Sequence, residues 1–102
     1  MSYLVKKTDT FSSWIGGLRD LRARAIIMSR LNRLAAGNFG DYKLLGDGVG
    51  EMRVDSGPGY RLYFTKQGSI LIILLCGGDK STQSRDIREA KAMARDLKEI
   101  RS

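Results

Sequence analysis

The segment GEMRVDSGPGYRLYF, residues 50–64, decides the fold that this sequence predicts. In both of its halves apolar residues alternate with charged or polar ones, at Met52, Val54, Tyr60, Leu62 and Phe64. A period of two is typical of strands that bury one face. The stretch between the halves contains glycine and proline, which mark a turn. The segment therefore predicts a β-hairpin.

The length of the turn sets the register of this hairpin. A loop over residues 55–59 puts the apolar residues of both strands on one face, whereas a loop one residue shorter would put Arg53 on that apolar face. Because register follows the buried face, we expect the longer loop. Arg53 then lies directly across from Arg61, and Glu51 across from Tyr63.

Two opposed arginines repel each other, and such pairs cost stability. Their placement on one sheet face therefore indicates that an anion binds between them, above all a phosphate. The alternative is an ordinary solvated face on which Glu51 and a second acid neutralise the two charges.

The rest of the chain predicts further strands and three helices. We expect strands at 42–46, 50–54, 60–66 and 69–76, and an edge strand at 3–7. The strand 69–76 is apolar on both faces, which favours a central, doubly covered position.

We expect a first helix capped by Asp9 or Thr10, a second from Asp20 to Gly37, and a last one over 82–100. In the second helix we expect a buried face with Leu21, Ala25, Met28, Ala35 and, beside them, Ile27, Leu31 and Leu34. Residues 1–102 thus form one α+β domain, a small antiparallel sheet with two N-terminal helices and a C-terminal helix.

The amino-acid composition limits the kinds of catalytic and metal site that this chain can form. The 102 residues contain 18 Lys and Arg against 11 Asp and Glu, no His and one Cys. Without histidine the usual general base and the commonest metal ligand are missing, so we expect no metal and no cofactor. The net charge of +7 favours an anionic partner such as nucleic acid, although a basic surface kept for solubility is the alternative.

Cys76 lies between apolar residues and glycines, so we expect a buried thiol and a reducing compartment. The first residues lack the apolar core of a signal peptide, and the apolar stretch 70–76 is too short to span a bilayer. We therefore expect a cytoplasmic protein without a membrane partner.

Lys80 follows two glycines, in the segment GGDKST, at the end of the strand 69–76. If that strand pairs with 60–66, its end emerges near Arg61. We expect Gly77 and Gly78 to allow a sharp turn there, so that Lys80 leans over the same sheet face. Ser81 or Thr82 would cap the following helix. The alternative is a solvated loop charge.

The second helix carries a run of arginines, Arg19, Arg22, Arg24, Arg30 and Arg33, against the single acid Asp20. We expect Arg19, Arg22 and Arg30 to dock on an RNA backbone. An acidic partner that covers this surface is the alternative.

Beyond these patterns, the chain resembles the RelE/ParE superfamily of type II toxins, and most closely its HigB-like branch of addiction-module killer proteins. The motifs that carry the resemblance are E-x-R-V at 51–54, G-x-G-Y-R-x-Y-F at 57–64 and G-G-D-K-S-x-Q-x-x-D-I at 77–87. The resemblance implies an endoribonuclease that acts in the ribosomal A site and cuts mRNA without a metal ion. In this reaction the 2′-hydroxyl of the RNA attacks the adjacent phosphate.

The resemblance also assigns roles to residues. Arg61 matches a phosphate-binding arginine, Lys80 a basic residue that supports the transition state, and Arg53 a position often held by a catalytic lysine. Asp86 falls near a position used for proton transfer, and Tyr63 would contact a base or a phosphate.

The resemblance implies partners as well: the ribosome, mRNA, and a cognate antitoxin of the helix-turn-helix, HigA-like kind. The ParE branch, however, has the same fold and inhibits DNA gyrase. A gyrase inhibitor, or an RNA-binding domain without catalysis, therefore remains an alternative.

Overall fold

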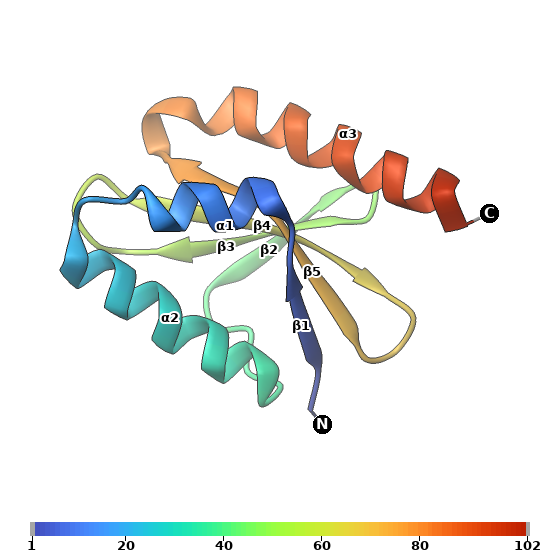
Figure 1. Cartoon of the computed structure of the whole chain (residues 1–102), viewed down its shortest axis with the longest axis horizontal. Coiled ribbons are helices and arrows are strands. Elements are labelled where there is room, and N and C mark those ends of the chain that lie inside the picture. The colour runs from blue at the N-terminus through green and yellow to red at the C-terminus, as the bar shows by residue number, and fades with distance from the viewer. Residues whose placement is uncertain (1, 102) are drawn as a thin grey trace.

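A computed structural model of the chain describes residues 2–101, with side chains described up to residue 98. Five strands form one sheet in the order β1-β5-β4-β3-β2, with three helices packed against it (Figure 1). The elements along the chain are β1 (Leu4–Lys7), α1 (Asp9–Gly16), α2 (Leu21–Ala35), β2 (Tyr42–Gly46), β3 (Val49–Val54), β4 (Tyr60–Gln67), β5 (Leu71–Asp79), a 3-10 turn (Lys80–Thr82) and α3 (Gln83–Arg101). The predicted α+β class is confirmed.

The expected register of the central hairpin is also confirmed. In the β3–β4 pair, Glu51 lies opposite Tyr63 and Arg53 lies opposite Arg61. The apolar side chains of the two strands enter one core on the opposite face, where Met52 and Leu62 are fully buried. The buried face therefore selected the register, as expected for a strand pair with one apolar side.

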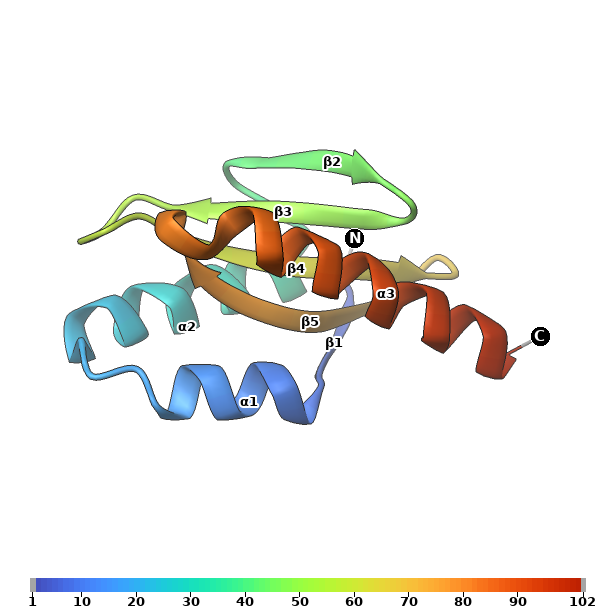
Figure 2. The same ribbon diagram turned by 90° about the horizontal axis from the view of Figure 1, so that it is seen from above.

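Two expectations for the sheet are corrected. The sheet is mixed, because β1 pairs with β5 in parallel, whereas the other pairs are antiparallel. Two helices separate β1 from the next strand, and such long connections permit parallel pairing. The central strand is β4, and β5 lies between β4 and the short edge strand β1, as Figure 2 shows. The expected double coverage of β5 is confirmed, since Leu74 belongs to one core and Leu75 to the other.

The helices cover opposite faces of the sheet. The larger core lies between the sheet and the first two helices and contains Phe11, Ile15, Ile27 and Leu34. The smaller core lies under α3 and contains Tyr63, Cys76, Ala90 and Ala94. Figure 1 shows α2 and α3 on opposite sides of the strands. The face under α3 is the one that carries Glu51, Arg53 and Arg61, because alternate residues of a strand share a face.

The helix starts are set by capping side chains. The expected cap Asp20 is confirmed: its carboxylate accepts a hydrogen bond from the backbone N–H of Ala23 at 3.0 Å. The first helix, however, is capped by Thr8 and not by Asp9 or Thr10. The Thr8 hydroxyl accepts from Phe11 N–H and donates to the carbonyl of Leu75 at 2.7 Å. The cap thus also fixes α1 to β5, a tertiary contact that helix periodicity does not contain.

The expected buried face of α2 is confirmed in part. Ile27, Leu31 and Leu34 are buried as expected, together with Ala23. The other expected positions are corrected, because Leu21 and Met28 are 70% and 40% exposed, Ala25 is exposed and Ala35 is half-buried. Helical spacing alone allowed either set of residues to be buried. Among residues 2–101, no helix combines the length and the apolar character needed to cross a membrane.

Gly77 and Gly78 lie within β5 and form no turn, which corrects a second expectation. A Cβ on Gly77 would lie 2.4 Å from the Trp14 ring, and a Cβ on Gly78 would collide with the Asp86 carboxylate. The two glycines therefore allow α1 and α3 to approach β5 closely, one on each face. Their role is close packing.

Candidate active site

Arg53, Arg61 and Lys80 line one shallow cavity of about 370 Å³. It lies at the hairpin end of the sheet, beside the start of α3, and its wall is completed by the loop between β3 and β4. The full lining consists of Asp41, Arg53, Asp55, Gly57, Pro58, Gly59, Arg61 and Lys80. The structure thus brings together the three cations that the sequence placed near one another, and adds two carboxylates.

Arg53 is held from below by a buried carboxylate. Glu51 is fully buried, and its Oε1 lies 3.5 Å from Nε of Arg53. Its other oxygen accepts a hydrogen bond from the side-chain amide of Gln83, at the first residue of α3, at 2.9 Å. Burial, together with the nearby Glu51 carboxylate, raises the pKa of the Tyr63 hydroxyl. Glu51 therefore links β3, β4 and α3 beneath the cavity and restrains Arg53.

Arg61 has a different environment from its cross-strand partner. Its Nε, like that of Arg53, is buried and has no hydrogen-bond partner among the residues that the structure describes. No carboxylate of the described residues forms an ion pair with it. A buried, unsatisfied donor on a cation is costly unless a ligand satisfies it. Arg61 is thus the residue of this cavity that is best placed to bind an anion.

Lys80 is exposed and begins the 3-10 turn that follows β5. The cap of this turn is Asp79, whose carboxylate accepts from Ser81 N–H at 2.8 Å. Hydrogen bonds from the Ser81 side chain and backbone lower the pKa of Asp79. Asp79 pairs with Tyr60, at the start of β4, and this pairing brings Lys80 beside the loop of the hairpin.

Asp86, which the resemblance places near a position used for proton transfer, is not among the residues that line the cavity. It is 3% exposed, and its carboxylate lies tightly over Gly78. The Thr82 hydroxyl donates a hydrogen bond to it, and Arg85 approaches it at 3.6 Å. Asp86 therefore fixes the start of α3 on β5.

The residues expected to bind RNA are separated by the structure. Tyr63 is fully buried under α3, so its ring has no access to a base. The guanidinium of Arg30 donates to three backbone carbonyls, those of Phe39, Asp41 and Arg53, the last at 2.6 Å. Burial lowers the pKa of Arg30, with a smaller effect of Arg33. Arg30 thus supports the cavity wall from behind.

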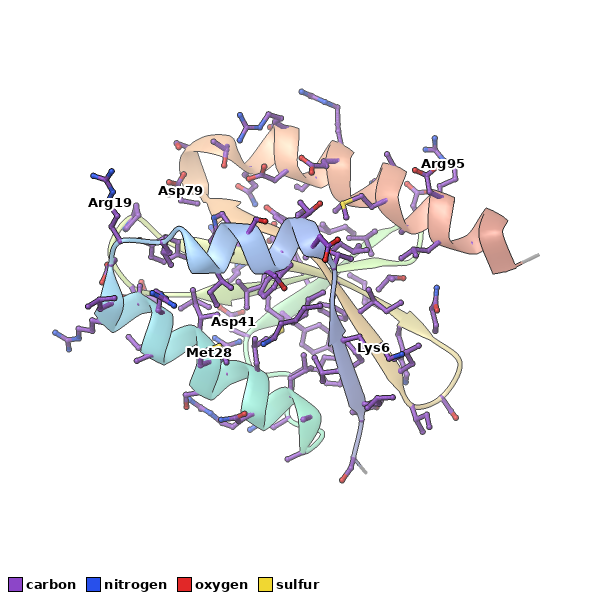
Figure 3. The ribbon with its side chains drawn as sticks, viewed as in Figure 1. Lys6, Arg19, Met28, Asp41, Asp79 and Arg95 are labelled. Atoms are coloured by element: carbon purple, nitrogen blue, oxygen red, sulfur yellow. The ribbon has the colours of Figure 1, made fainter. Side chains whose placement is uncertain are left out.

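Arg19 and Arg22 are exposed and lie outside the cavity. Figure 3 shows Arg19 extending into solvent from the segment between α1 and α2. Their expected contact with RNA therefore stays a prediction.

Three site residues were missed by the sequence: Asp41, Asp55 and Gln83. Asp55 follows the last residue of β3, so the five-residue loop already placed it beside Arg53. Asp41 joins the cavity because its carbonyl accepts from Arg53 N–H at 2.9 Å, which depends on how β2 pairs with β3. Gln83 depends on how α3 docks, and sequence periodicity carries no signal for this contact.

The cavity therefore combines three cations with two carboxylates. Elsewhere, within the described part of the chain, no group of three or more His, Cys, Asp or Glu side chains is arranged to hold a metal ion.

Comparison with known proteins gives one relative by sequence and one solved structure with a similar fold. A protein of Haemophilus influenzae (strain ATCC 51907 / DSM 11121 / KW20 / Rd), named only as an uncharacterized protein, is 53% identical over 97 residues, which span 95% of this chain and 98% of the relative. Among solved structures, the chain is similar to a double mutant of the E. coli toxin RelE in the free state. The TM-score is 0.69 at 18% sequence identity, over 88% of this chain and 95% of RelE, so the two share a fold. No family model matches the chain.

Proposed function

Because this chain belongs to one family with the uncharacterized H. influenzae protein and has the fold of the RelE toxin, we propose that it is the toxin of a toxin–antitoxin module that cleaves mRNA on the ribosome. The observation that carries the proposal is the cavity shared by Arg53, Arg61 and Lys80. Three cations, two of them with a buried Nε donor that has no hydrogen-bond partner in the described structure, suit a phosphate that gains charge during the reaction.

The reaction is an internal transfer within the RNA. The 2′-oxygen of one nucleotide forms a bond to the adjacent phosphorus, and the bond from phosphorus to the 5′-oxygen of the next nucleotide breaks. The products are a 2′,3′-cyclic phosphate and a 5′-hydroxyl. The nucleophile belongs to the substrate, so the protein supplies positioning, charge stabilisation and proton transfer.

Each cation then has a separate role. Arg61 binds the reacting phosphate through the donors that are free in the described structure. Arg53 stays protonated and acts electrostatically, held in place by Glu51. Lys80 is exposed and is the acid that protonates the departing 5′-oxygen.

The proton of the 2′-hydroxyl needs an acceptor within the cavity. Asp86 is buried outside it, whereas Asp41 and Asp55 line it. We therefore place the general base at one of these two carboxylates. The substitutions Asp41→Asn and Asp55→Asn show which carboxylate is the general base. Only the substitution that removes the base should slow cleavage while RNA binding persists.

The partners follow from the same proposal. The ribosome would deliver the mRNA, and a cognate antitoxin of the helix-turn-helix, HigA-like kind would neutralise the toxin. The motifs at 51–54 and 77–87 support the HigB-like branch.

The test adds the purified protein to a reconstituted translation reaction and maps mRNA 5′ ends by primer extension. New ends within translated codons are expected, only with ribosomes present, and they should disappear with Lys80→Ala. Intact mRNA with normal translation would overturn the proposal. A loss of gyrase supercoiling activity under those conditions would identify a gyrase inhibitor, and RNA binding alone would identify a domain without catalysis.

A further inference from the structure

A second basic groove lies at the other end of α3. It has a volume of about 570 Å³ and lies between the C-terminal half of α3, the turn that joins β2 to β3, and the turn that joins β4 to β5. Its lining consists of Asp47, Gly48, Thr65, Lys66, Gln67, Gly68, Lys91, Ala94, Arg95 and Lys98. No residue of this groove belongs to the candidate active site.

The groove has an excess of positive charge. The lining contains four cations and a single acid, Asp47. That acid lies 3.3 Å from Lys91 and forms an ion pair with it. The Lys66 ammonium lies 5.0 Å from the centre of the Tyr3 ring, on the other face of the sheet. Arg95 and Lys98 are exposed, and neither has a carboxylate partner among the described side chains. Exposed cations along one concave surface raise the local concentration of a polyanion.

The character of the lining favours a nucleic-acid backbone over an acidic protein. Besides its charged groups, the groove is formed by small residues, Gly48, Gly68, Thr65 and Ala94. A protein partner needs a pocket for a large apolar anchor, and no large apolar or aromatic side chain lines this groove. Phosphates need only cations and room for the chain.

The position relative to the active site strengthens this inference. Arg61 lies near the start of β4, and Thr65, which lines the groove on the same face of the strand, lies near its end. At about 3.3 Å per residue, the two residues lie roughly 13 Å apart along the strand. Figure 3 shows Asp79 before the first turn of α3 and Arg95 in its C-terminal half. One RNA strand can therefore reach both sites.

We propose that this groove binds the phosphate backbone of a single-stranded RNA segment, as an anchoring site separate from the candidate active site. We expect binding to depend on the charge of the backbone and not on base identity, because no aromatic side chain on which a base could stack lines the groove. This binding goes beyond the proposed cleavage and does not require it.

The test measures binding of a fluorescein-labelled 2′-O-methyl RNA of about 20 nucleotides, longer than the site of one small nucleic-acid-binding domain. Such an RNA has no free 2′-hydroxyl, so the result is independent of nuclease activity. Fluorescence anisotropy across a salt series is compared for the wild type, Arg95→Ala/Lys98→Ala and the control Lys6→Ala/Arg88→Ala. All four residues are exposed, and both double variants lose two charges.

The Arg95→Ala/Lys98→Ala protein should bind more weakly, and the slope of log affinity against log salt should fall by about 1.4, since each phosphate contact on a single strand contributes about 0.7. The control should keep the wild-type slope, and Arg95→Lys/Lys98→Arg should restore binding. Equal slopes for the two alanine variants would overturn the proposal. Unchanged RNA binding with lost binding of a polyglutamate peptide would also overturn it, in favour of an acidic protein partner.

Discussion

Arg53 and Arg61 face each other directly across the β3–β4 pair, yet only Arg53 has an acidic partner. Glu51 compensates the charge of Arg53 from within the protein, whereas no described carboxylate forms an ion pair with Arg61. The Nε donor of each arginine is buried without a hydrogen-bond partner in the described structure. Without a ligand the two like charges repel each other. This arrangement costs stability and is the signature of a site that is completed by an anion.

The first prediction concerns this repulsion. Arg61→Ala should leave the free energy of unfolding unchanged or raise it by up to about 1 kcal/mol, because a like-charge pair is removed. The same change should lower mRNA cleavage about 100- to 1000-fold, the usual effect of losing one stabilising group at a transition state. Urea unfolding and primer extension measure the two effects. Arg88→Ala, an exposed arginine on α3, is the matched control and should alter neither. A large loss of stability in Arg61→Ala would show that Arg61 has a structural role.

A second prediction concerns the carboxylate beneath the cavity. Glu51→Gln keeps the shape of a fully buried side chain but removes the charge that faces Arg53. We expect a loss of about 1–3 kcal/mol in unfolding free energy, measured by urea denaturation. Gln83→Ala removes one hydrogen bond to the same carboxylate and should cost less, about 1 kcal/mol. Wild-type stability in Glu51→Gln would contradict the supporting role of Glu51.

The third prediction compares two glycines. Gly78→Ala should destabilise the protein by about 1–3 kcal/mol, because the new methyl group collides with the Asp86 carboxylate and lies 2.8 Å from Thr82 Oγ1. Gly16→Ala has no atom within 4 Å of the new methyl group and should stabilise by about 0.4–1 kcal/mol. Thermal unfolding compares the two. If both changes had the same sign, close packing of α3 on Gly78 would be refuted.

Alkaline pH gives a fourth prediction. Burial raises the pKa of the Cys76 thiol from about 9.0 to about 12. The folded state therefore keeps a proton that the unfolded state loses above about pH 9, so the unfolding free energy should fall as pH rises from 9 towards 12. The expected slope is about 1.4 kcal/mol per pH unit from this group. Urea unfolding between about pH 8 and pH 10 measures it. Cys76→Ala should have a shallower slope, and equal slopes would contradict the assignment.

The fifth prediction tests Arg30 as a structural support. Arg30→Ala removes a partly buried guanidinium that donates to the carbonyls of Phe39, Asp41 and Arg53. We expect a loss of about 2–3 kcal/mol in unfolding free energy, since hydrogen bonds from a charged donor are strong. Arg22→Ala, on the exposed part of the same helix, should change stability by less than about 0.5 kcal/mol. Equal effects of the two substitutions would contradict the structural role of Arg30 and favour the RNA-binding surface role that the sequence predicted for it.

The sequence predicted the fold wherever a local pattern determines a structure. Alternation over residues 50–64 was sufficient for the hairpin, its register and the opposition of Arg53 to Arg61. The Asp20 cap was equally local. Thr8 was missed because its hydroxyl is placed by a contact with Leu75, which lies far along the chain.

The site was predicted in part for the same reason. Arg53 and Arg61 follow from register, and Lys80 follows from the pairing of β5 with β4. The packing of α3 decided the remaining residues, since it buries Tyr63 and Asp86 and brings Gln83 to Glu51. No periodicity in the sequence reports how a helix docks on a sheet, so these roles required the structure.

The central claim is that this cavity cleaves mRNA through the substrate's own 2′-hydroxyl. The most direct test uses a ribosome-bound mRNA that carries a single 2′-deoxynucleotide at the position mapped as the cleavage site. The account predicts that this mRNA stays intact, while the all-ribose mRNA is cut to a 2′,3′-cyclic phosphate and a 5′-hydroxyl end. Equal cleavage of the two mRNAs would contradict the account.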